Sequence, residues 1–268
     1  MHSRRNFLRH AAAAAGGVVF CSCGLLDAAR AQEPRRAKLP VKVRGRTVKT
    51  IDTHAHCLFH EAVNLMGDAA KDVPPKTKGG PQFFFTVEER LKGMDAQAID
   101  MEILSINPFW YRKDRDTAAE IVRIQNEKLA ELCGQHPDRF GAFASLTLQF
   151  PDLAVQQLET AMKKQGLQGA AIGGSVAGED FSDPKFHPVW AKAEELGAVL
   201  FIHPQSTPEL AKRFKGNGWL ANLIGNPLDT TIALQHLIFE GTLDKFPNLK
   251  VIAAHGGGYL GSYAPRSD

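Results

Sequence analysis

Short apolar segments alternate along most of the chain with longer segments of helical periodicity. The apolar runs do not alternate strictly with polar residues, which is typical of parallel strands buried on both faces. The runs are VKTID (48–52), EILSIN (102–107), FGAFASLTL (140–148), GAAIGG (169–174), AVLFIH (198–203) and KVIAAH (250–255). We therefore predict six strands of a parallel sheet.

Helix signals occupy the intervals between these runs. TVEE offers Thr86 as an N-cap with Glu89 three residues later, which is a capping box. Apolar spacing predicts a second helix over about 116–133, ending at Gly134. Further helices are expected to begin near Pro151, Pro184 and Asn226. Strands that alternate with helices form right-handed βαβ units, and about six units indicate a (β/α)₈ barrel or a doubly wound sheet.

The first residues read as an export signal and not as part of this fold. Paired Arg4 and Arg5 precede an apolar run, and ARA at 29–31 resembles a cleavage site. This order is typical of a twin-arginine signal peptide over residues 1–31, which predicts a periplasmic or secreted protein. Residues 32–47 read as a linker, and 48–268 as a barrel domain. Gly67 to Gly80 reads as a long polar loop, of the kind that forms lids or walls.

Charge and cysteine content exclude several classes of protein. The leader holds four arginines and one aspartate, so the formal charge falls from +3 to 3 − (4 − 1) = 0 after cleavage. A neutral mature chain argues against binding to nucleic acid or to a membrane surface, and no membrane span is expected in it. Only Cys57 and Cys133 remain, too few for a disulfide framework.

Four histidines follow apolar runs. His54 and His56 lie two residues apart, so in a strand both side chains point to the same face. His203 and His255 end two further runs. The carboxyl ends of the strands of a parallel barrel open on one face, where such enzymes build their active sites. We therefore expect the four side chains to converge, as the donors of a metal site would.

The remaining histidines have ordinary structural explanations. His136 lies at a helix end, His187 at a helix start and His236 within an apolar helix face. His60 lies close to the H-x-H pair in sequence, so lining the mouth of the site is an alternative to a structural role.

The motifs together resemble a known family. IDTHAH, HPDRFGAFASL, FIHPQ and NPLDTTIALQHLIFEGTLDKFPNLKVIAAHGGGYL look like the amidohydrolase-related family. They resemble especially its branch typified by 2-amino-3-carboxymuconate-6-semialdehyde decarboxylase and γ-resorcylate decarboxylase. The resemblance extends from about Val48 to the end of the chain, and implies a metal-dependent TIM barrel.

The resemblance also implies roles for individual residues. His54, His56 and His203 would be metal ligands, and His255 the acid/base residue. Asp52 matches the aspartate that often precedes H-x-H; orienting a ligand histidine and a purely structural role are equal alternatives. Three imidazoles suit zinc, with manganese or iron as alternatives.

One part of the family pattern has no match. Members carry two more strands, the last of which supplies an aspartate to the metal, whereas this sequence ends thirteen residues after His255. The resemblance therefore predicts an incomplete barrel of about six βα units. An inactive barrel or a binding protein is accordingly an alternative to an enzyme.

The resemblance to the decarboxylase branch implies the non-oxidative decarboxylation of an aromatic or unsaturated carboxylic acid. The same residues would serve a metal-dependent hydrolase of a lactone, ester or amide, which is the alternative. Phe109, Trp110 and Tyr111 follow the second strand and would stack on a flat substrate, unless they only anchor the loop. Arg266 resembles the family arginine that reaches the substrate carboxylate, in some members across a homodimer interface.

Overall fold

The structure is a computed structural model that describes residues 40–72, 86–205, 207–216 and 219–267. The signal peptide predicted for residues 1–31 lies outside the described residues. So do residues 32–39, the first half of the predicted linker, and residues 73–80 at the end of the predicted polar loop.

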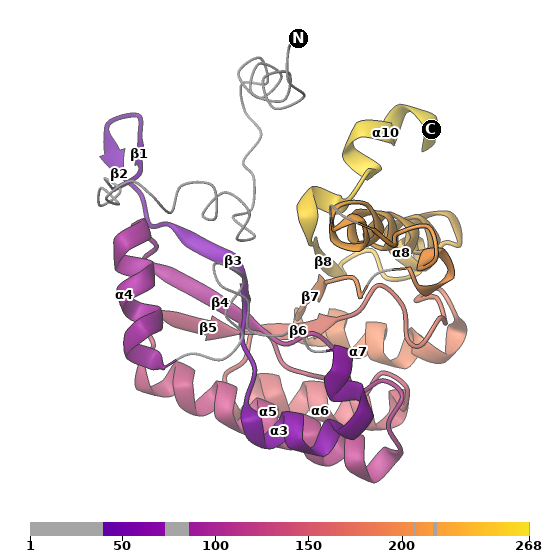
Figure 1. The fold of residues 1–268 in the computed structure, drawn as a ribbon, viewed down its shortest axis with the longest axis horizontal. Coiled ribbons are helices and arrows are strands. Elements are labelled where there is room, and N and C mark those ends of the chain that lie inside the picture. The colour runs from indigo at the N-terminus through magenta and orange to yellow at the C-terminus, as the bar shows by residue number, and fades with distance from the viewer. Residues whose placement is uncertain (1–39, 73–85, 206, 217–218, 268) are drawn as a thin grey trace.

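Six parallel strands form the centre of the molecule, and all six were predicted (Figure 1). They are β3 Ile51–His56, β4 Met101–Ser105, β5 Phe140–Ala142, β6 Gly169–Ile172, β7 Val199–Ile202 and β8 Lys250–Ala253. The strands pair in chain order as two three-stranded sheets, and a parallel bridge between Ala144 and Ala170 joins β5 to β6. Among the described strands nothing pairs with the outer edge of β3 or of β8, so the sheet is an open arc.

Helices connect successive strands, and one further helix, α10, follows the last strand. They are α3 His60–Met66, α4 Val87–Gln97, α5 Arg115–Gln135, α6 Pro151–Lys164, α7 His187–Leu196, α8 Asn226–Phe239, α9 Thr242–Lys245 and α10 Leu260–Ser267. Short helical turns complete the connections: η1 Gly67–Asp72, η2 Pro184–Phe186, η3 Pro208–Leu210, η4 Ala221–Gly225 and η5 His255–Gly257. The predicted capping box is confirmed, because Thr86 accepts from the Glu89 N–H while the Glu89 side chain accepts from the Thr86 N–H. None of the described helices is long and apolar enough to cross a bilayer.

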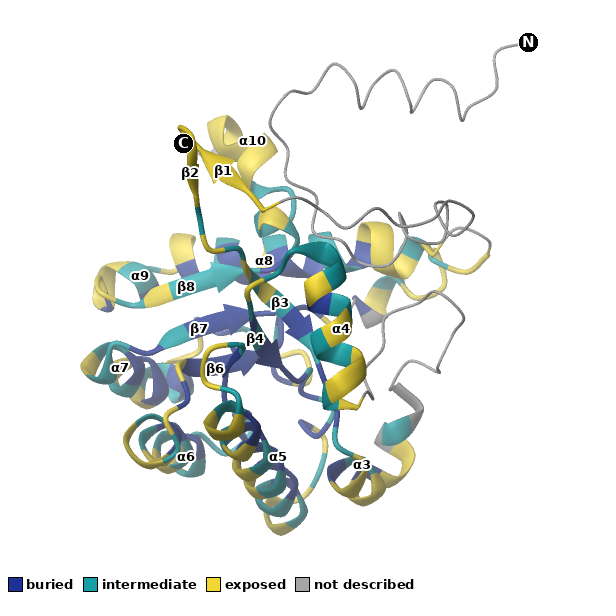
Figure 2. Cartoon of the chain, turned by 90° about the vertical axis from the view of Figure 1, so that its left-hand side faces the viewer, coloured by how far each residue is buried: buried dark blue, intermediate teal, exposed yellow. Residues whose placement is uncertain are grey.

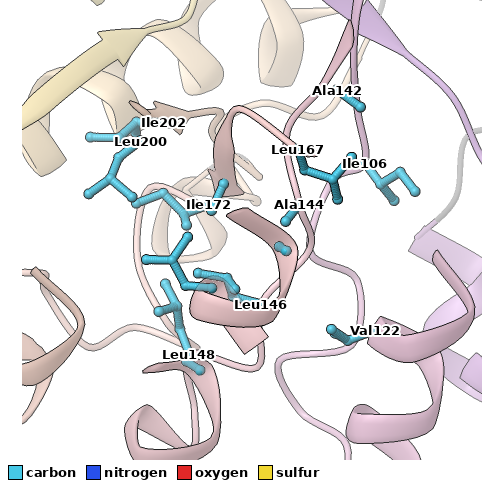
Figure 3. Close-up of a cluster of buried hydrophobic side chains, with 14 of the residues drawn as sticks. Ile106, Val122, Ala142, Ala144, Leu146, Leu148, Leu167, Ile172, Leu200 and Ile202 are labelled. Atoms are coloured by element: carbon cyan, nitrogen blue, oxygen red, sulfur yellow. The ribbon is translucent and has the colours of Figure 1, made fainter. Parts of the chain in front are cut away.

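The two faces of the arc carry different clusters of side chains. The outer face packs against the helices in one large core, which includes Leu200 and Ile202 from β7 and Val122 from α5 (Figures 2 and 3). Burial of such a leucine or isoleucine contributes about 1.5–3 kcal/mol. The inner face carries a smaller cluster centred on Phe143 and Phe201, whose rings stack with centroids 5.5 Å apart. This inner cluster lies beneath the histidines.

Two segments differ from the prediction. Residues 40–47 were expected to be linker, yet they form a hairpin of β1 Lys42–Val43 and β2 Arg46–Thr47. Residues 67–72 were expected to be loop, yet they form a 3₁₀ turn. Both elements are short, and the alternation of Val41 and Val43 with polar residues covers too few positions to predict a strand.

Candidate metal centre

His54 and His56 lie on the inner face of β3. The His54 ring packs edge-on against Phe201 of the inner cluster, with ring centroids 5.3 Å apart. The pairing register between β3 and β4 shifts between Asp52 and Ala55. Such an irregularity bends a strand and re-aims its side chains. The bend therefore occurs at the position of the first histidine.

His203 and His255 reach the same place from the other half of the arc. His203 follows β7, is buried, and donates its backbone N–H to the Ile172 carbonyl at 2.8 Å. Ala254 belongs to the inner cluster, so a regular strand would turn His255 to the outer face. Instead His255 has a φ of +56°, and this left-handed backbone brings its ring within 5.2 Å of the His54 ring, measured between centroids.

The glycines after His255 make this turn. Gly256, Gly257 and Gly258 all have positive φ, which glycine adopts without steric cost. At Gly258 a Cβ atom would lie 2.1 Å from the Pro227 carbonyl oxygen, so only glycine allows this close approach to the start of α8. The glycines of HGGG therefore allow the backbone turn that positions His255.

The four imidazoles converge, as the sequence predicts. The Nε2 atom of His56 lies 3.0 Å from Nε2 of His54 and 3.2 Å from Nε2 of His203. Ligand nitrogens of His54, His203 and His255 all lie within 4.8 Å of one another. The rings therefore form two overlapping triads that share His54 and His203.

Electrostatics favour the neutral form of the two buried rings, those of His56 and His203. Burial, followed by the nearby histidines, lowers the pKa of His56 and of His203 well below the ordinary range. Neutral imidazole is the form that binds a metal ion. Nitrogens held about 2.1 Å from one ion lie roughly 3.0–3.4 Å apart, from octahedral to tetrahedral angles, a range that includes both spacings of His56 Nε2, 3.0 Å and 3.2 Å. The donor set therefore fits a divalent transition metal.

Asp52 contacts the backbone near this site. Its Oδ1 atom accepts a hydrogen bond from the His54 backbone N–H at 2.9 Å. This hydrogen bond fixes the local geometry of β3, which is the purely structural role expected as one alternative for Asp52. The other alternative, in which Asp52 orients the imidazole of a ligand histidine, stays a prediction.

Arg90 and Glu102 were missed by sequence reasoning. The Arg90 Nε atom contacts Glu102 Oε2 at 2.5 Å, and its NH1 group donates to the His56 carbonyl at 2.9 Å. Arg90 thus links α4 and β4 to the end of β3. Burial raises the pKa of Glu102, and the adjacent guanidinium opposes that rise. No local motif marks such a pair, because its members belong to different elements.

Ser105 is a second residue that sequence reasoning missed. It pairs in register with His56, so both side chains lie on the inner face. Its Oγ atom is buried and has no hydrogen-bond partner among the described residues. A buried hydroxyl without a partner is costly, which makes it a candidate contact for a ligand. Its position at the end of the second predicted strand could have identified Ser105 as a candidate site residue.

Asp229 also lies near the carboxyl ends of the strands. Its Oδ2 atom accepts from the backbone N–H of Gln205, two residues after His203, at 3.1 Å. The carboxylate occupies the space that a Cβ atom at Gly174 would take. Burial raises its pKa from 3.8 to about 6. Asp229 thus connects the loops that follow β6 and β7.

The aromatic residues after β4 are mainly structural in their contacts. Trp110 is completely buried and donates from Nε1 to the Leu146 carbonyl at 2.9 Å. The Tyr111 hydroxyl is buried and accepts from the Gly173 N–H at 3.4 Å. These contacts anchor the loop after β4, which was the alternative to substrate stacking, and they do not support a substrate role for Trp110. Phe109 is half-buried, and its role stays a prediction.

Arg266 and the remaining histidines lie on other parts of the surface. Arg266 is exposed on α10 and lines a groove with Tyr259 and Tyr263 of the same segment and with residues of α8. His236 contacts Glu240, and His136 is the C-cap of α5. His187 begins α7, and His60 is exposed at the start of α3.

The sequence model of the amidohydrolase family matches residues 51–266, which is most of the chain. The chain belongs to the amidohydrolase family. Within this family it is 33% identical over 171 residues to 2-amino-3-carboxymuconate-6-semialdehyde decarboxylase of Dictyostelium discoideum, covering 63% of this chain and 47% of that protein. It is 35% identical over 180 residues to γ-resorcylate decarboxylase of Rhizobium radiobacter, covering 63% and 55%.

Solved structures of amidohydrolase relatives share the fold. A dihydroxybenzoic acid decarboxylase from Polaromonas sp. JS666, solved with manganese and the inhibitor 2-nitroresorcinol, superposes with a TM-score of 0.71 at 27% identity. The superposition covers 81% of this chain and 68% of that one. The predicted TIM-type fold is confirmed, and its described strands form an open arc. The chain spans about half the length of the curated relatives it matches.

Proposed function

We propose that this amidohydrolase is a metal-dependent, non-oxidative decarboxylase of an aromatic or unsaturated carboxylic acid. The observation that carries the proposal is the convergence of four histidines at the carboxyl ends of three strands. The three relatives described above are decarboxylases by name, which favours decarboxylation over hydrolysis.

His54, His56 and His203 would hold the metal. When bound, a divalent ion supplies Lewis acidity to a substrate oxygen. Zinc is the expectation from three imidazole donors. Manganese is the alternative, because it is the ion in the Polaromonas relative.

His255 would be the proton donor. Its turn presents the imidazole beside the proposed ligands, and histidine exchanges protons near neutral pH. The bond between the ring carbon and the carboxylate breaks, CO₂ leaves, and the carbon receives a proton through His255. Ser105 is buried on the same inner face, within reach of a ligand that contacts His56. Phe109 and Arg266 are the further substrate contacts proposed from sequence, and a homodimer would bring Arg266 to a partner's site.

The experiment combines metal analysis with an activity panel. Metal-loaded protein is incubated with aromatic and unsaturated carboxylic acids and, in parallel, with lactones, esters and amides. Released CO₂ with a solvent-derived hydrogen on the product carbon supports a decarboxylase. Hydrolysis of a lactone, ester or amide, without CO₂ from any acid, supports the hydrolase alternative. If neither reaction is detected, the result supports a binding protein.

Two histidine variants test the assigned roles. His255→Asn should retain the metal and lose activity by roughly 10²–10⁴-fold, the range for a general acid/base. His203→Ala should lose the metal itself. Loss of metal from His255→Asn would instead make His255 a ligand, as the second triad allows.

Export by the twin-arginine route is a separate proposal, motivated by SRRNFL and ARA near the N-terminus. Changing Arg4 and Arg5 to lysine should leave the precursor in the cytoplasm, as cell fractionation would show. Normal export of that variant would contradict the proposal.

A further inference from the structure

The β1–β2 hairpin projects from the sheet at the beginning of β3 (Figure 1). Lys42 pairs with Thr47 and Val43 with Arg46, and the Val48 N–H donates to the Val41 carbonyl at 3.0 Å. The turn residues Arg44 and Gly45 both have positive φ, which is the geometry of a tight hairpin turn. The hairpin is thus a formed element whose residues 41–47 are all exposed.

This hairpin concentrates positive charge. Lys42, Arg44, Arg46 and Lys49 are exposed, and within the described part of the chain none of them has an ion pair. No acidic residue occurs between Glu33 and Asp52 in the sequence. Some exposed cations elsewhere have carboxylate partners, as Arg123 does with Glu120, whereas others, such as Lys212 and Arg213, have none among the described residues. The neutral total charge of the mature chain conceals this local excess.

Exposed aliphatic side chains accompany the cations. Val41 is 46% exposed and Val43 is 53% exposed. The register places both valines on one face of the hairpin, with Arg46 and Val48, while Lys42 and Thr47 face the other side. The element therefore offers an aliphatic face bordered by cations.

We propose that this hairpin binds the surface of a bilayer containing anionic phospholipids. Cations attract anionic headgroups, while aliphatic side chains gain by entering the boundary between headgroups and acyl chains. A second copy of the chain would bring like charges together. Single-stranded nucleic acid is bound with stacking aromatic side chains, and residues 41–49 contain none.

The proposal sets the orientation of the protein on the membrane. The hairpin precedes Ile51, whereas the histidines lie at the opposite end of the strands. Six residues of strand separate the two ends by about 20 Å at 3.3 Å per residue. The candidate metal centre would then face away from the bilayer, open to dissolved substrate.

Vesicle sedimentation tests the proposal. The full chain and its predicted processed form, starting at Gln32, are both mixed with phosphatidylcholine vesicles, with or without about one third phosphatidylglycerol. An uncleaved apolar leader could bind lipid by itself, so the processed form gives the cleaner result. We expect binding to anionic vesicles that weakens as salt rises, because salt screens exposed charges.

Two hairpin variants identify the contacts. Replacing Lys42, Arg44, Arg46 and Lys49 with glutamine should weaken binding about 100-fold or more, at roughly fivefold per cation. Val41→Ser/Val43→Ser should weaken it by about tenfold through the lost apolar contact. The matched control replaces four cations elsewhere that have acidic partners, two of them exposed and two half-buried, and should bind as the parent does: Arg123, Lys163, Lys185 and Lys192.

Circular dichroism checks that each variant is folded. Equal binding by the hairpin and control variants would overturn the proposal, as would failure of the parent to bind anionic vesicles at low salt. Binding to single-stranded DNA under the same conditions, without binding to vesicles, would overturn it in favour of a nucleic-acid partner.

Discussion

At the scale of single residues, the site depends on where side chains point. The sequence was sufficient to predict that His54 and His56 share a face, because side chains in a strand repeat every two residues. It was also sufficient to predict that His203 would join them at the end of another strand. The position of the His255 side chain at the site depends on the left-handed backbone of His255 itself. The three glycines after it indicated an unusual turn but did not specify this conformation.

Ser105→Ala tests the buried hydroxyl beside His56. If Oγ contacts substrate, its loss should lower kcat/KM by about 2–10-fold, the value of one hydrogen bond of 0.5–1.5 kcal/mol. Stability should stay the same or rise, because a buried hydroxyl without a partner is removed. The matched control is Thr242→Val on α9, which removes another such hydroxyl away from the strand ends. Unchanged kinetics in Ser105→Ala would exclude the contact.

Asp229→Asn tests the buried carboxyl group. Its pKa in the fold, about 6, is above its ordinary value of 3.8, so folding favours the neutral acid. That contribution is complete below about pH 4 and is lost as the pH rises through 6. The variant keeps an acceptor for Gln205, so it should be more stable than the parent at pH 7–8, by up to about 3 kcal/mol. Urea unfolding should show this difference vanishing toward pH 4; a difference that grows at low pH would contradict it.

At the scale of elements, apolar runs and capping residues carried most of the prediction. Each of the six runs overlaps a strand, and the helix predicted over 116–133 lies inside α5. The irregular register of β3 was not predictable, because it depends on how β4 packs beside it. The Arg90–Glu102 pair was hidden for the same reason, since its partners belong to α4 and β4.

Arg90→Leu should destabilise the fold by about 3–5 kcal/mol, because it leaves Glu102 buried without its partner. The loss should be smaller at pH 5 than at pH 8, since the carboxyl group, whose pKa burial already raises, can then be protonated. Unfolding by urea of Arg90→Leu, Glu102→Leu and the double variant measures the coupling. Arg123→Leu is the control, because its pair with Glu120 is exposed to solvent and should contribute little to stability. Equal losses in the two arginine variants would contradict this assignment.

At the scale of the whole molecule, the histidines connect the two halves of an open arc. The alternation of strands and helices predicted the barrel, and the family pattern predicted that it would be incomplete. The positions of the Trp110 and Arg266 side chains could not be predicted from the sequence, because the packing of a loop or a chain end depends on which residues from other elements lie against it. The three-stranded sheets are joined through the bridge at Ala144 and Ala170, while His54 and His203 meet across the inner face.

Metal binding should therefore stabilise the entire fold. An ion held by His54 and His56 from β3 and by His203 after β7 would tie the first sheet to the second, and it would bind only when both are folded. At a free metal concentration of 100 Kd the gain is about 2.7 kcal/mol, or roughly 5–10 °C in Tm for a chain of this size. Calorimetry of chelated and metal-loaded protein should show this shift in the parent and in His236→Ala, whose histidine lies outside the cluster. His203→Ala should show little or none, and an undiminished shift in that variant would place the metal elsewhere.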